Sequence, residues 1–147
     1  MFKRLMVPID GSELSTHAIQ QGLDLARQLG ATVTGFVVEA MPALPTMGTH
    51  LANYQREVKE HEATTEAHAR RLLAHFEKAA AEAGVAFDGQ YERNDDVAGA
   101  IAGAADRSGC DMIVMATHGR GAFGELLFGS QTKRVMALSK LPLLVLH

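Results

Sequence analysis

Residues 111–132 read DMIVMATHGRGAFGELLFGSQT, and this stretch decides the fold. The apolar run at 111–116 is typical of a strand buried on both faces of a parallel sheet. Four glycines follow it, and a helical pattern begins at Ser130. Glycines let the backbone approach a phosphate, and the start of a helix offers free N–H groups and a favourable dipole. The stretch therefore predicts a nucleotide-binding loop in an α/β protein.

The alternation of strand and helix continues on both sides of this stretch. Further apolar runs, each predicted to be a strand, lie at residues 2–9, 32–39, 85–92 and 143–146. Helical patterns occupy residues 13–29, 53–83, 97–108 and 130–139, with an acidic start at 94–96 before the third. The first helix places small and apolar residues on one face: Ile19, Gly22, Leu23, Ala26 and Leu29. Such alternation predicts a single domain over residues 1–147, with a parallel sheet covered by helices on both sides.

Composition narrows the class of partner. The chain has 147 residues and a net charge of -3 without a basic tract, which argues against nucleic acid as a partner. The single cysteine, Cys110, precludes an internal disulfide, fits a reduced cytoplasmic setting and is expected to be a packing residue. The N-terminus lacks the apolar segment of a signal peptide. No stretch approaches the ~18 apolar residues of a membrane span, so no membrane partner is expected.

Two well-known nucleotide motifs match the glycines only in part. Gly119, Gly121 and Gly124 fit G-x-G-x-x-G, but that motif opens a first βαβ unit and needs an acidic residue about 20 positions later. Here it opens the last unit, and Glu125 is the final acidic residue of the chain. Gly124 and Gly129 have the spacing of a Walker loop, but no lysine follows them. Both motifs are therefore disfavoured.

The whole segment resembles the universal stress protein family, whose ATP-binding members carry G-x2-G-x9-G-[S/T] after the fourth strand. Gly119, Gly129 and Ser130 match that spacing, whereas Ala116 stands at the first glycine. Residues 7–12 (VPIDGS) and 141–145 (LPLLV) resemble the family's first strand end and its closing strand. The resemblance implies a Rossmann-like open sheet of five parallel strands in the order 3-2-1-4-5. It also implies ATP as a regulatory ligand in stress response, with any Mg²⁺ held by the phosphates, and a homodimer formed through residues 143–146.

The same resemblance implies a set of nucleotide-binding residues. Asp10 would accept hydrogen bonds from the ribose or the adenine edge, with a cap of the first helix as the alternative or additional role. Val37 would pack on the base, unless it is an ordinary core residue, and Arg120 would touch a phosphate or solvent. Pro8 and Ile9 would shape the adenine pocket, with Met115 and Ala116 next to the ribose. The remaining residues would surround the phosphates: Gly119, Gly129, Ser130, Gln131 and Thr132.

Other features favour binding over catalysis. No set of catalytic groups is evident, and His118, the only nearby base, is expected to be a hydrogen-bonding residue, so any ATP hydrolysis would be slow. His61, His68 and His75 recur every seven residues, about 10 Å apart on a helix, which predicts a solvated or contact surface and no metal site. A dimer that binds a protein partner and no nucleotide is the alternative, because of Ala116. A small metabolic enzyme is disfavoured. The loop at 40–50 either covers the ligand or is disordered.

Overall fold

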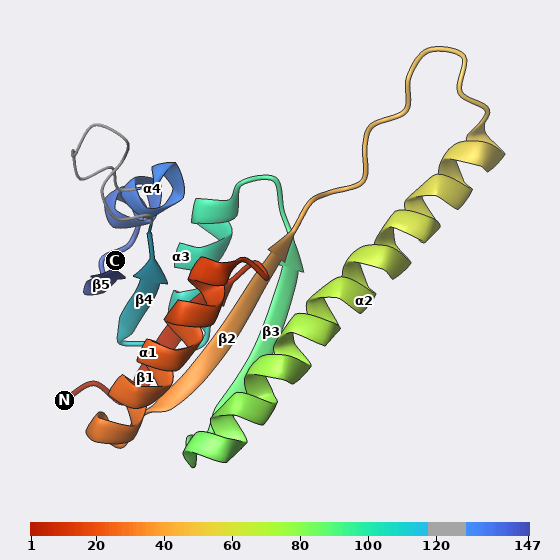
Figure 1. The fold of residues 1–147 in the computed structure, drawn as a ribbon. Helices are drawn as coiled ribbons and strands as arrows, with labels where there is room; N and C mark the ends of the chain where they lie inside the picture. Colours follow the sequence, from red (N-terminus) through yellow and green to blue (C-terminus); the bar gives the residue numbers. More distant parts are fainter. Residues whose placement is uncertain (118–128) are drawn as a thin grey trace.

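A computed structural model describes residues 1–117 and 129–147. Strands and helices alternate in the order β1 (Arg4–Ile9), α1 (Glu13–Leu29), β2 (Thr32–Glu39), α2 (Leu51–Ala83), β3 (Phe87–Arg93), α3 (Val97–Arg107), β4 (Met112–Ala116), α4 (Ser130–Leu138) and β5 (Leu143–Leu146). All neighbouring strands are parallel, and the sheet order is β3-β2-β1-β4-β5 (Figure 1). The predicted Rossmann-like α/β fold is confirmed.

The helices cover the two faces of the sheet in pairs (Figure 1). On one face, residues of α1 and α2 pack against alternate residues of β1, among them Val7 and Ile9. On the other face, residues of α3 and α4 pack against Met6, Phe36 and Met115. The alternation follows from the period of a strand, in which successive side chains point to opposite faces.

Glycines end the first two helices where they were expected to. Gly30 and Gly84 adopt φ values of 64° and 69°, in the left-handed region that glycine occupies at no steric cost. Val85 still belongs to the turn that closes α2, because its N–H donates to Ala80 O. β3 consequently begins at Phe87, two residues later than predicted. Leu29, predicted on the buried face of α1, is 40% exposed because the chain turns away directly after it.

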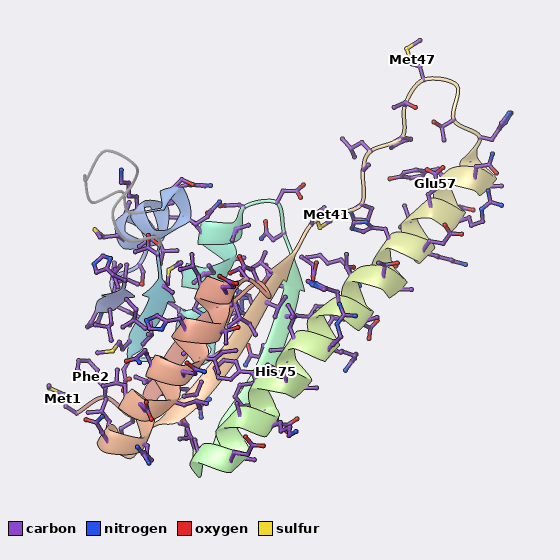
Figure 2. All side chains as sticks on the ribbon, in the orientation of Figure 1. Met1, Phe2, Met41, Met47, Glu57 and His75 are labelled. Carbon is purple, nitrogen blue, oxygen red and sulfur yellow. The ribbon has the colours of Figure 1, made fainter. Side chains whose placement is uncertain are left out.

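The N-terminal half of α2 extends beyond the sheet together with the loop before it (Figure 1). We call residues 40–64 the arm. All the buried residues of α2 lie at Thr65 or later, so the helical part of the arm contributes none of them. Met47 lies at the tip of the arm (Figure 2), fully exposed. Within the described part of the chain, no helix has the length and apolar character to cross a membrane.

Two of the three histidines that recur every seven residues along α2 contact the segment where β2 ends and the arm begins. His61 Nε2 lies 2.8 Å from Ala40 O, and His68 Nδ1 pairs with Glu39 Oε1. His75 is exposed. The described residues contain no group of three His, Cys, Asp or Glu side chains that could hold a metal ion. His61 and His68 therefore form an intramolecular contact surface.

Candidate functional site

A cavity of about 320 Å³ opens at the carboxyl ends of β1, β2 and β4, beside the starts of α1, α3 and α4. In open parallel sheets, ligands bind at this edge. The residues that line the cavity are Pro8, Ile9, Asp10, Ser12, Leu14, Ser15, Ala18, Phe36, Val38, Val97, Ile101, Met115, Ala116, Thr117, Gly129, Ser130, Gln131 and Thr132. The arm contributes none of them, so the loop at 40–50 does not cover the cavity.

Nine of the twelve residues predicted to bind nucleotide come together here: Pro8, Ile9, Asp10, Met115, Ala116, Gly129, Ser130, Gln131 and Thr132. They come from three separate parts of the chain, which the parallel sheet brings to a common edge. Gly119 and Arg120, and also His118, lie outside the described residues.

Val37 is the exception among the described residues. Its side chain is 1% exposed and lies in the core between the sheet and the helices α1 and α2. Its neighbours Phe36 and Val38 line the cavity instead, because they point to the other face of β2. The predicted contact between the Val37 side chain and a base is therefore corrected. The phase of the strand was the signal that could have found Phe36 and Val38.

One wall of the cavity is apolar. Phe36 and Val38 come from β2, and Val97 and Ile101 lie one turn apart on α3. None of these four residues was among those predicted to bind nucleotide. Spacing by four residues places Val97 and Ile101 on the same helix face, so both reach the cavity together. This wall offers a flat, apolar ligand group a surface to pack against.

A hydrogen-bonded group at the end of β1 forms a polar part of the cavity lining. Asp10 Oδ1 accepts from Ser15 Oγ at 2.6 Å and from Ser12 N at 3.0 Å. Ser12 caps α1, because its hydroxyl accepts from Ser15 N at 3.2 Å, so Asp10 is not the cap. Burial opposes ionisation of Asp10, but hydrogen bonds from Ser12 and Ser15 outweigh it and hold the carboxyl pKa below its ordinary value of 3.8. Asp10 is thus an anionic acceptor at neutral pH.

The start of α4 forms a second polar part of the lining. Gly129 is the N-cap and provides no side-chain hydrogen bond to the helix. Its own N–H donates to Thr117 Oγ1 at 3.0 Å, which joins the end of β4 to the start of α4. The first-turn N–H groups of Ser130, Gln131 and Thr132 have no side-chain cap, as at helix ends that bind anions.

Ala116, the departure from the family's loop pattern, is compatible with its place in the fold. It pairs with Leu146 at the end of β4, in ordinary strand structure. No non-glycine residue in the described part of the chain has a positive φ. An alanine therefore causes no backbone strain here, and the residue lines the cavity.

A five-stranded parallel sheet of this order, with a cavity at its carboxyl edge, defines a Rossmann-like α/β domain. The chain belongs to the universal stress protein family, whose family model matches residues 1–147. It is 33% identical to a universal stress protein of Thermus aquaticus over 151 residues, covering 100% of both chains. It is 27% identical to the universal stress protein YxiE of Bacillus subtilis over 149 residues, again covering 100% of both.

Solved structures show the same fold. A universal stress protein family structure from Burkholderia pseudomallei is 25% identical with a TM-score of 0.73, covering 99% of this chain and 96% of that one. Two more distant structures hold ligands. One is a universal stress protein in complex with cAMP, 20% identical with a TM-score of 0.71, covering 99% of this chain and 97% of that one. The other, from Arabidopsis thaliana, has AMP bound and is 15% identical with a TM-score of 0.66, covering 98% and 90%.

Proposed function

We propose that this protein binds an adenine nucleotide, ATP above all, as a regulatory ligand in a stress response. The observation that carries the proposal is the convergence of nine sequence-predicted residues on one cavity. The cavity volume, about 320 Å³, lies within the range of small-molecule sites. Family members that bind cAMP and AMP support the choice of ligand class.

The apolar and the polar parts of the lining suit different parts of a nucleotide. The apolar side chains Phe36, Val38, Val97 and Ile101 suit the adenine ring. The anionic Asp10 suits the donor hydroxyls of ribose, and the uncapped start of α4 suits phosphates. Any Mg²⁺ would be held by the phosphates of the nucleotide. Gly119 and Arg120 remain part of the proposed phosphate site.

We also propose a homodimer that forms through β5. Within the described sheet, β5 pairs only with β4, and its four residues are apolar and partly buried. β3, at the other edge, carries Asp88, Glu92 and Arg93, which are charges of the kind that block strand pairing. A cytoplasmic location completes the proposal, because adenine nucleotides are abundant there.

The test is a measurement of bound nucleotide and of ligand-induced stability. Denaturing the purified protein and separating the supernatant by chromatography should release an adenine nucleotide, or added ATP should raise the melting temperature. GTP serves as the control for base selectivity. If no nucleotide is released and millimolar ATP gives no thermal shift, the proposal is wrong and the protein acts without a nucleotide.

A charge at the start of α4 tests the phosphate position. Ser130→Glu introduces a carboxylate where the phosphates are proposed to lie, so ATP should lose its stabilising effect. An acidic residue is favourable in a first helical turn, so the fold should tolerate the change. Ala137→Glu, an exposed position near the other end of α4, is the charge-matched control and should still bind ATP.

A further inference from the structure

Ser15 is a buried hydroxyl in the first turn of α1, and its exposed fraction is 7%. It lines the cavity beside Asp10 but is already fully engaged with its own chain. It donates to Asp10 Oδ1 at 2.6 Å and accepts from Asp10 N at 2.7 Å. Because a hydroxyl has one proton to donate, Ser15 has no donor left for a ligand.

The two oxygens of Asp10 are used differently. Oδ1 takes the hydrogen bonds from both Ser15 Oγ and Ser12 N. Within the described residues, Oδ2 takes none, although Asp10 lines the cavity. A carboxylate held through one oxygen presents the other in a fixed direction, which lowers the entropy lost when a ligand binds.

We propose that Ser15 is a positioning residue that fixes the Asp10 carboxylate and leaves Oδ2 as the acceptor for the ribose hydroxyls. The inference rests on the proposed function, because it concerns the sugar of the same nucleotide. It assigns the site a preference for ribonucleotides over nucleotides that lack the ribose hydroxyls. Ser15 contributes to this preference through Asp10 and without touching the ligand.

Binding of ATP and of 2′,3′-dideoxy-ATP to purified protein tests this role by titration calorimetry. Ser15→Ala should weaken ATP binding by about fivefold, the size of one orienting hydrogen bond, and leave dideoxy-ATP binding unchanged. Thr16→Ala removes an exposed hydroxyl from the same helical turn and should change neither affinity. Equal weakening of both nucleotides by Ser15→Ala would assign Ser15 a structural role alone and overturn the inference.

Asp10→Asn provides a second route that leaves Ser15 in place. The amide keeps an oxygen for Ser15 and Ser12 but puts an NH₂ group, which cannot accept, in place of Oδ2. It should abolish the preference for ATP over dideoxy-ATP, and adding Ser15→Ala to it should have no further effect. If Asp10→Asn keeps the preference, the ribose contact lies elsewhere and the inference is wrong.

A measurement without nucleotide separates this inference from the proposed function. Carbon NMR titration of the Asp10 carboxyl group should show its pKa rising in Ser15→Ala, because a hydrogen bond to the ionised form is lost. An unchanged Asp10 titration overturns the positioning role even if ATP binds. If Asp10 titrates as expected but the wild-type protein binds neither nucleotide, the proposed function is wrong, and so is the assignment of Asp10 to the ribose.

Discussion

The guanidinium of Arg134 on α4 lies 2.7 Å from Oδ1 of Asp96, the residue that caps α3. The same oxygen accepts from Gly99 N at 3.2 Å, so one carboxylate both caps its own helix and holds its neighbour. Both helices begin at the cavity, where Val97 and Thr132 line the wall. The pair therefore couples two helix starts that face the proposed ligand.

The two partners of this pair should differ in their contribution to stability. Both side chains are about half exposed, so we expect Arg134→Ala to lower the free energy of unfolding by at most about 0.5 kcal/mol. Asp96→Ala also removes the cap of α3 and should lower the free energy of unfolding by about 1 kcal/mol more than Arg134→Ala does. Urea denaturation measures both losses, with Arg71→Ala, at an exposed position of α2, as the control near zero. Equal losses from the two variants would contradict this division.

Gly35 on β2 should not tolerate a side chain. A Cβ there would lie 2.7 Å from Phe87 Cε2 and 2.8 Å from Phe76 Cδ1, inside a ring pair whose centroids are 4.8 Å apart. Gly35→Ala should therefore destabilise the fold by about 1–3 kcal/mol, as overpacking does. The same change in a Phe87→Leu background should cost less, because part of the clash is removed. Additive losses would show that the rings are not responsible.

Ala116 should matter little to nucleotide affinity. Since the residue is in strand structure without a positive φ, Ala116→Gly releases no strain and removes only a methyl group. We expect the Kd for ATP to change by less than about threefold, or roughly 0.6 kcal/mol. Titration calorimetry measures the change. Tenfold tighter binding would instead show that the methyl group obstructs the nucleotide.

Cys110 should be an inert thiol in the folded protein. The residue is 6% exposed, and burial raises the pKa of its thiol above 9.0. The native thiol should thus react with Ellman's reagent far more slowly than the urea-unfolded one. Because the raised pKa favours the protonated thiol, its stabilising effect is complete below pH 9 and is lost as the pH rises further. Cys110→Ala should remove this part of the loss of stability at alkaline pH. An unchanged loss would contradict the raised pKa of the thiol.

If the protein dimerises through β5, a charge on that strand should lower its mass in solution. Val145, which pairs with Met115 inside the sheet, lies on the edge strand β5. Val145→Lys places a charge on that edge and should shift the protein toward monomer in analytical ultracentrifugation. Asp88→Lys changes a charge on the opposite edge strand and should leave the mass unaltered. Circular dichroism checks that both variants fold, and an unchanged mass for a folded Val145→Lys excludes this interface.

Sequence patterns predicted the elements well wherever local chemistry decides them. The bounds of α1, β2 and β5 match the prediction, since Gly30 and the flanking turns define them locally. It was harder to predict which side chains of β2 face the cavity, because both faces of the strand are covered and its residues carry no polar alternation. The family resemblance implied Val37, and nothing in the local pattern pointed to Phe36 or Val38 instead. Ser15 was missed because its role depends on a hydrogen bond that forms only in the folded turn.

The arm has a consequence for how the molecule can be engineered. Residues 51–64 provide none of the buried residues of α2, so their helical hydrogen bonds depend on continuing from the packed turns after Thr65. Amide exchange should accordingly be fastest at the beginning of α2 and slow progressively along it. The chain near Met47 and Gly48 serves neither the core nor the cavity. It is a permissive point for inserting a reporter domain, at which the sheet and its ligand site stay whole.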